Sequence, residues 1–307
     1  MTASTQKKEN FTNGVVLFLD ILGWKNLSTD FSKAKPISTI PKLTIDYLMG
    51  ILKNSELKTA EIDSLIDRIE TYFFSDTIVF IVKGDWESVD DVFNDLFGLL
   101  HSMSYLQTTF IGNKVLVRGA ITFGEIYSNV EDNVIFGPAL NKAYELESQT
   151  AIYPRIILDP YIYRKICKKL ENQAENLENK INHEIINNFK ADYDGYVFWD
   201  YLKNSLGRSL RSKQKDKLPD DVKDLYFIHR DLITENLKIN LIEGDNKDSS
   251  SNLKVFQKYN WLLNYHNDFV NTYLIESSLE ATNGFYNKVK EKVNLDFNVN
   301  DLIINVV

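Results

Sequence analysis

The first half of the chain consists of apolar segments separated by short polar breaks. Residues 15–24 (VVLFLDILGW) form a continuous apolar stretch rich in Val, Leu and Phe, which is typical of a buried strand. Asp20 interrupts this stretch near its end. Because a buried carboxylate is costly unless it is paired or binds a cation, Asp20 is a candidate functional residue. Residues 28–65 predict mostly helix, with Pro36 and Pro41 as breaks.

The next segments show two different periodicities. In residues 70–82 (ETYFFSDTIVFIV), two β-rich halves flank Ser75 and Asp76, a pair suited to a tight turn, so the pattern predicts a β-hairpin. In residues 88–105 the apolar positions recur at helical spacing. Residues 115–127 (VLVRGAITFGEIY) predict a further strand.

A polar turn at 129–133 leads into the last part of this region. Gly137 and Pro138 precede a predicted helix, and a short strand (RIILD) ends at Asp159. The order is strand, helix, hairpin, helix, strand, helix, strand. This order predicts an α+β fold in which helices pack on a sheet.

The chain changes character near residue 160. Residues 164–190 are heavily charged with a helical pattern, and the last third of the chain is helical again. We therefore expect a flexible N-terminus at 1–13, an α+β domain at 14–160 and a mainly helical C-terminal extension at 161–307.

Composition narrows the class of protein. The chain has 307 residues and a formal net charge of -8, a sign that disfavours binding of nucleic acid through its phosphates. The single cysteine, Cys167, excludes an internal disulfide framework, and the scattered histidines lack the spacing of a zinc site. No stretch approaches the ~20 apolar residues of a membrane helix. We expect a cytoplasmic protein without membrane insertion.

Two acidic residues stand where carboxylates are rare, Asp20 at the end of an apolar strand and Asp76 in the turn of an apolar hairpin. Magnesium is usually bound by one or two carboxylates together with phosphate oxygens. Two carboxylates at adjacent strand ends would share two such ions over a triphosphate. The alternative interpretations are a strand-end carboxylate satisfied by its neighbours for Asp20 and an ordinary turn residue for Asp76.

The segments FLDILGW, SDTIVF and VRGAITFGEIY, followed by FGPALNKAYELE, resemble class III nucleotidyl cyclases in their order and spacing over about residues 14–160. The resemblance implies a class III cyclase-like (ferredoxin-like) sheet. It also implies that Asp20 and Asp76 hold two divalent cations, Mn2+ or Mg2+, with the main-chain carbonyl of Ile21 as a further ligand.

The resemblance also assigns groups to the substrate. Leu22, Gly23 and Trp24 match the loop whose N–H groups hold the triphosphate, a physically sensible use of a strand-to-helix turn. Asn141 matches the catalytic asparagine of the family in the order G-x-x-L-N-x-A. The family builds its site across a head-to-tail homodimer, in which the aspartates and the asparagine come from different protomers.

Three positions depart from the purine cyclases of this family. Tyr72 stands where those enzymes have a base-reading Lys, and Val134 stands where they have a second polar base reader. Glu145 occupies the position of the transition-state Arg, and its opposite charge cannot stabilise a pentavalent phosphorus. Another cation would have to replace that Arg. The candidates are Arg118, which we favour, Lys142 and Arg155.

With these departures the chain resembles the pyrimidine cyclases of bacterial Pycsar anti-phage systems. The strand pattern R-G-x-I-x-x-G-E and the C-terminal extension with Asp192, Asp194 and Gly195 are further points of resemblance. A bulky Tyr72 would exclude a two-ring purine from the base pocket. The resemblance implies a cyclase that makes cyclic UMP or cyclic CMP for a separate effector that binds the signal. We favour UTP over CTP as the substrate, and no residue of the sequence separates a uracil from a cytosine edge. The alternatives are a purine cyclase and a degenerate cyclase-like domain that binds a nucleotide without turnover. The absence of a G-G-D-E-F-type hairpin argues against a diguanylate-cyclase-like enzyme.

Overall fold

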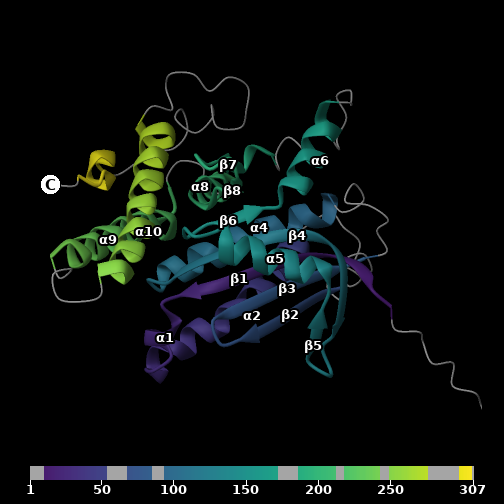
Figure 1. Cartoon of the computed structure of the whole chain (residues 1–307). Coiled ribbons are helices and arrows are strands. Elements are labelled where there is room, and N and C mark those ends of the chain that lie inside the picture. The colour runs from purple at the N-terminus through teal and green to yellow at the C-terminus, as the bar shows by residue number, and fades with distance from the viewer. Residues whose placement is uncertain are drawn as a thin grey trace, which may run out of the picture.

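A mixed β-sheet forms the centre of the fold and carries the candidate site (Figure 1). The computed structural model describes residues 10–53, 68–84, 93–171, 186–211, 218–242, 249–275 and 297–305. Within these residues the strands lie in the order β2-β3-β1-β4-β6-β8-β7, and β5 pairs with β4. The strands are β1 (Thr12–Leu22), β2 (Ile69–Phe74), β3 (Thr77–Lys83), β4 (Leu116–Asn129), β5 (Val134–Phe136), β6 (Ile156–Leu158), β7 (Phe189–Ala191) and β8 (Val197–Trp199).

Helices pack on both faces and along one flank of this sheet (Figure 1). The α-helices are α1 (Trp24–Leu27), α2 (Phe31–Lys53), α4 (Phe93–Gly112), α5 (Pro138–Gln149), α6 (Pro160–Glu171), α8 (Tyr201–Arg211), α9 (Asp220–Ile242) and α10 (Ser249–Phe269). The π-helix η3 (Val270–Ile275) continues α10, and the 3-10 helix η5 (Val299–Leu302) lies near the C-terminus. None of the helices within the described ranges is long and apolar enough to cross a bilayer.

The first half of the chain has ferredoxin-like topology. The elements β1, α2, β2, β3, α4 and β4 follow one another, and their strands pair antiparallel in the order β2-β3-β1-β4. This is the β-α-β-β-α-β arrangement. The predicted α+β class is therefore confirmed. The predicted hairpin is also confirmed, since β2 and β3 flank Ser75 and Asp76.

The central strand β1 divides its side chains between two cores because successive strand residues point to opposite faces. Leu17 and Leu19 belong to the larger core, which α2 and α4 cover. Val16 belongs to the smaller core under α5, and Phe18 packs against that core. Asp20 has the same parity as these last two residues, so it lies on the α5 face of the sheet.

Two predicted helices differ from the structure in their extent. Helix α2 continues through Pro36 and Pro41, which were expected to break it. Burial of Ile37 and Ile40 on the sheet outweighs the backbone hydrogen bonds that the two prolines remove. The helix expected at 88–105 continues to Gly112, because further apolar residues on the same helix also reach the core. Residues 54–65 and 88–92 of these expectations lie outside the described residues.

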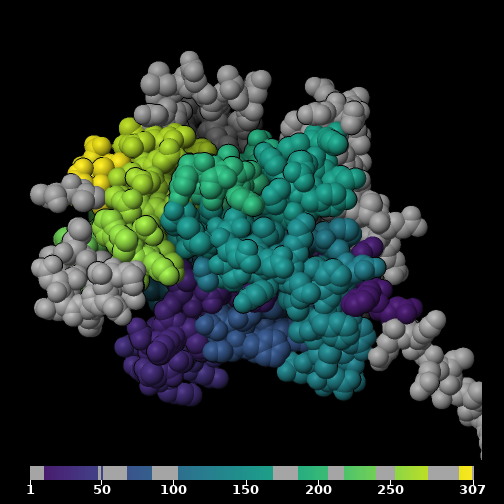
Figure 2. Space-filling model, in the orientation of Figure 1, coloured from purple at the N-terminus to yellow at the C-terminus, as the bar shows by residue number. Residues whose placement is uncertain are grey.

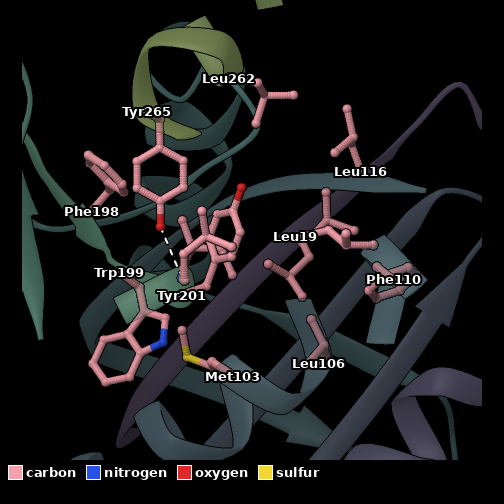
Figure 3. Close-up of a cluster of buried hydrophobic side chains, with 14 of the residues drawn as sticks. Leu19, Met103, Leu106, Phe110, Leu116, Phe198, Trp199, Tyr201, Leu262 and Tyr265 are labelled. Carbon is pink, nitrogen blue, oxygen red and sulfur yellow. Dashed lines mark hydrogen bonds between the residues drawn. The ribbon is translucent and has the colours of Figure 1, made fainter. Parts of the chain in front are cut away.

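The C-terminal extension contributes to the same sheet and the same core. Strand β8 pairs with β6 through Ile157 and Phe198, and β7 pairs with β8. Trp199 and Leu262 belong to one apolar cluster with Leu19 (Figure 3). The extension is mainly helical as expected, and the domain division at residue 160 stays a prediction. The C-terminal helices α9 and α10 lie against the flank of the sheet (Figure 1), and the yellow-green residues of α10 pack against the teal central part of the chain (Figure 2).

A chain of hydrogen bonds between buried polar groups links the helices of the extension. His266 Nε2 lies 3.0 Å from the carbonyl oxygen of Leu302, which can only accept a hydrogen bond. The Nδ1 atoms of His229 and His266 are 2.9 Å apart, and His229 Nε2 is 2.9 Å from the hydroxyl of Tyr201. Two neutral rings satisfy every bond, with His266 donating to Leu302, His229 donating to His266 and Tyr201 donating to His229. Burial accordingly lowers the pKa of both imidazoles.

Candidate active site

The two predicted metal aspartates lie at the same end of adjacent strands. Asp20 on β1 is the cross-strand partner of Thr77 on β3, and Asp76 directly precedes Thr77 in the hairpin turn. Ser75 adopts a φ of 56°, which closes this turn tightly. The N–H of Ile21 donates a hydrogen bond of 2.8 Å to the carbonyl oxygen of Asp76 and so fixes the turn against β1. The sheet thus places both half-buried carboxylates at one edge of the site.

An ion-pair chain joins Asp20 to the helix above the sheet. Arg118 on β4 is the direct cross-strand partner of Asp20, and its Nε donates to Asp20 Oδ2 at 3.1 Å. The same Nε lies 2.7 Å from Oε1 of Glu147 on α5. The single N–H of Arg118 Nε points to Asp20. Glu147 Oε1 therefore receives no hydrogen bond within the described part of the chain. Glu147 therefore forms an ion pair with Arg118 but its Oε1 lacks a hydrogen-bond donor.

Burial governs the protonation of Glu147, a residue that is 3% exposed. Desolvation raises the pKa of this carboxyl to about 7, the Arg118 guanidinium opposes the rise, and the charges of Asp20 and Asp76 add to it. Glu147 is not among the residues predicted from the sequence. The signal that could have found it is the i, i+4, i+8 spacing with Ala139 and Ala143, the other buried residues of α5.

The donor set at this edge fits a hard divalent cation. Asp20 and Asp76 supply carboxylate oxygens, which Mg2+ and Mn2+ prefer, and the Ile21 carbonyl lies on the same short stretch of strand. Within the described residues no group of three or more His, Cys, Asp or Glu side chains is placed to hold a metal ion. Two carboxylates therefore define the candidate centre, and the remaining ligands would come from main chain, water or phosphate.

The predicted phosphate loop is a tight turn at the end of β1. Gly23 adopts the left-handed conformation, with a φ of 79°, and precedes the short helix α1. A β-carbon at this position would meet nothing within 4 Å, so the requirement for glycine comes from the backbone alone. Trp24 packs edge to face on Phe73 of β2, with ring centroids 6.0 Å apart. Leu22 completes the turn, which thus lies beside the hairpin that carries Asp76.

Tyr72, the predicted base reader, is only 2% exposed and belongs to the core under α5. Its hydroxyl donates to Glu70 Oε2 at 3.0 Å, and Glu70 pairs with Lys83 at 2.5 Å. Burial, followed by the charge of Glu70, raises the pKa of Tyr72 to about 12, so its hydroxyl keeps the proton that it donates. The groups that reach the surface here are therefore Glu70 and Lys83.

Glu70 and Lys83 line an open hollow of about 570 Å³, together with Thr12, Ser128 and other residues of the β1 and β4 ends. Lys83 Nζ also donates to the carbonyl oxygen of Ser128 at 3.3 Å. The hollow lies at the opposite end of β1 from Asp20, because Gly14 pairs with Lys83 and Asp20 pairs with Thr77. The hollow therefore lies away from the two aspartates of the same chain, whereas Tyr72 itself lies level with Phe18, two residues before Asp20 on β1.

Asn141 lies on the exposed side of α5 with Glu145, which is one helical turn further along. Gly137 is the residue that directly precedes this helix, and its backbone conformation sets where the helix begins. Its φ is 147°, and a β-carbon there would lie 2.8 Å from the carbonyl oxygen of Glu125. Within the described chain, the side chain of Asn141 forms no hydrogen bond with Asp20 or Asp76.

The three cations proposed to replace the transition-state Arg differ in availability. Arg155 is fully buried and is held by Asp192 and Asp194. Lys142 forms an ion pair with Asp159. Of the three, Arg118 is the one that touches a predicted metal aspartate.

The extension brings to this cluster a further cation, which is not among the residues predicted from the sequence. Lys258 on α10 is half-buried. Desolvation and the charge of Arg118 lower its pKa, while the charges of Asp20 and Glu147 oppose that shift. Its position close to these three residues depends on the packing of α10, so no local pattern in the sequence marks it.

No known family model matches the chain. No curated protein matches it either. Among solved structures, it is similar to the guanylyl cyclase Cya2, with 12% sequence identity and a TM-score of 0.35 over 62% of this chain and 92% of that one. A likeness of this size does not establish the family or an activity.

Proposed function

We propose that the chain is a pyrimidine nucleotide cyclase that converts UTP, favoured over CTP, to the 3′,5′-cyclic nucleotide and pyrophosphate. The observation that carries this proposal is the placement of Asp20 and Asp76 at adjacent strand ends of a ferredoxin-like sheet, with Arg118 in contact with Asp20. The resemblance of these segments to class III cyclases supports the same activity. A cytoplasmic signal for anti-phage defence, read by a separate effector, is the corresponding role.

In the proposed reaction the ribose 3′ oxygen attacks the α-phosphorus in line. The bond from the α-phosphorus to the oxygen of the β-phosphate breaks, pyrophosphate leaves, and the 3′-hydroxyl proton passes to water. Two divalent cations, held by Asp20, Asp76 and the Ile21 carbonyl, would lower the pKa of the 3′-hydroxyl and neutralise the triphosphate. The turn at Leu22, Gly23 and Trp24 would hold the phosphates through its N–H groups.

We assign base recognition to Tyr72 acting with its surface partners. The Tyr72 ring fills the space under α5, and its hydroxyl holds Glu70. Glu70 then offers an acceptor and Lys83 a donor at the hollow beside them. A ring edge that carries both a donor and an acceptor, as uracil does, would complement such a pair.

A head-to-tail homodimer would complete the site. Asn141 is exposed and, among the described residues, forms no hydrogen bond with the aspartates of its own chain, so we expect it to act on the aspartates of a second copy. Exposed aromatic side chains lie on or beside the face that α5 covers, and they suit contact with a partner. They include Phe74, Phe136 and Tyr144.

Glu145 favours a second candidate function, a cyclase-like domain that binds a nucleotide without turnover. It is exposed on the same side of α5 as Asn141, where a catalytic cation would be expected. A purine cyclase is the nearest enzymatic alternative.

A turnover assay tests the proposal directly. The protein is incubated with Mn2+ and each of ATP, GTP, CTP and UTP, and products are identified by mass spectrometry. We expect a 3′,5′-cyclic pyrimidine from the wild type, none from Asp76→Ala, and normal turnover from Asp221→Ala, which removes an exposed acid of α9. A cyclic purine would overturn the base assignment. Nucleotide binding without any product would favour the domain without turnover.

A further inference from the structure

The cationic side chains of Arg118 and Lys142 near the candidate site are already paired with carboxylates of the same chain. The guanidinium of Arg118 lies between Asp20 and Glu147, both within 3.1 Å of its Nε. Lys142 is paired with Asp159. Beside the two proposed metal ions, a triphosphate that brings several negative charges to this edge would therefore need a further cation from the protein.

Helix α10 places Lys258 beside this edge. Leu262, one turn further along the helix, belongs to the same buried cluster as Leu116, which lies on β4 two residues before Arg118 and on the same face of that strand (Figure 3). The stem of Lys258 is half-buried, and its ammonium forms no ion pair with any acid in the described part of the chain. A lysine in this setting is anchored by packing while its charge remains available.

We propose that Lys258 is a phosphate-binding residue of the active site, supplied by the C-terminal extension. This inference rests on the proposed cyclase activity. It gives the extension a direct part in catalysis, because the ammonium would bind the triphosphate and the charge that develops on the leaving pyrophosphate. The electrostatic influence of Asp20, Arg118 and Glu147 on the pKa of Lys258 agrees with this position.

Inorganic pyrophosphate with Mn2+ is the probe, because it carries the leaving-group charge and no base. Its affinity for the full chain is measured by isothermal titration calorimetry in the wild type and in Lys258→Met, which keeps the apolar stem and removes the charge. We expect pyrophosphate to bind about tenfold more weakly to the variant and kcat to fall about 100-fold. Lys258→Arg should recover most of both losses, and thermal unfolding should show that all variants are folded.

Two controls separate the explanations. Lys238→Ala removes an exposed charge of α9 and should leave both measurements unchanged. Lys25→Met removes the exposed lysine next to the turn at Gly23 and tests that lysine as the rival phosphate ligand. Normal pyrophosphate affinity and kcat in Lys258→Met would overturn the inference. It would also be overturned if pyrophosphate affinity and kcat fell in Lys25→Met and not in Lys258→Met. A wild type that turns over no nucleotide would contradict the proposed function, whereas an active wild type with an unaffected Lys258→Met would contradict this inference alone.

Discussion

Arg118 on β4 faces Asp20 on β1 as its direct cross-strand partner, and the Arg118 Nε donates to Asp20 Oδ2 at 3.1 Å. This pair links the central strand of the sheet to the buried Glu147 of α5, whose carboxylate shares the same guanidinium. The arrangement holds Asp20 in place, and it makes the charge of each member depend on the others.

Removal of Arg118 should therefore destabilise the fold as well as impair activity. In Arg118→Ala, Asp20 and the buried Glu147 lose their common cation, and we expect a loss of about 2–4 kcal/mol in the free energy of unfolding. Urea unfolding followed by circular dichroism measures this loss. The double variant Arg118→Ala, Glu147→Gln removes the buried carboxyl that has lost its cation and should regain part of the stability without regaining turnover. An unchanged urea midpoint in Arg118→Ala would show that the ion-pair chain is not structural.

Acid should destabilise the C-terminal extension through its buried histidines. Burial lowers the pKa of His266 to about 4 and that of His229 well below its usual range. Between pH 6.5 and about 4 the unfolded chain binds more protons than the folded one, so stability falls as the pH falls through this window. His266 alone should contribute about 2 kcal/mol of loss at pH 5.

Urea unfolding at pH 7 and pH 5 measures this effect. In His266→Gln the dependence on pH between these values should be weaker than in the wild type, although the variant is less stable at pH 7. Equal pH dependence in the two proteins would contradict the assignment of neutral, buried rings.

Gly137 should control the position of Asn141. Its φ of 147° disfavours any side chain, and a β-carbon would approach the Glu125 carbonyl oxygen to 2.8 Å. We expect Gly137→Ala to cost about 1–3 kcal/mol in stability and to lower kcat, because the start of α5 must move. Gly112→Ala is the matched control, since a β-carbon there meets nothing within 4 Å. Thermal unfolding and turnover of both variants test this, and equal behaviour would contradict it.

Mixing two inactive variants should restore activity if the site is shared between copies. Asp76→Ala lacks a metal ligand, and Asn141→Ala lacks the residue that the partner would supply. In an equimolar mixture that exchanges subunits, half of the dimers are mixed and each has one intact site, so about a quarter of wild-type turnover should return. Turnover that stays at background, in a sample shown to exchange, would contradict a shared site.

Tyr72 should affect substrate choice through Glu70. Tyr72→Phe keeps the ring under α5 but removes the hydroxyl that holds Glu70 Oε2 at 3.0 Å. We expect a stability loss of about 1 kcal/mol and a raised KM for the pyrimidine nucleotide with a smaller change in kcat. Phe73→Tyr adds a hydroxyl to an exposed neighbour and should leave KM unchanged. Identical KM values for wild type and Tyr72→Phe would remove Tyr72 from base recognition.

The sequence by itself determined the four longer strands β1 to β4, the short strand β6 and the hairpin turn at Ser75 and Asp76, because these depend on local periodicity and turn chemistry. Tertiary structure decided that Arg118 and Asp20, 98 residues apart in the chain, form an ion pair. It also decided that the helix containing Pro36 and Pro41 remains continuous, that Tyr72 is buried, and that Glu147, Lys258 and the histidine pair find their partners. The physical reason is that burial and charge pairing depend on which distant segments pack together, and no short window of sequence contains that information.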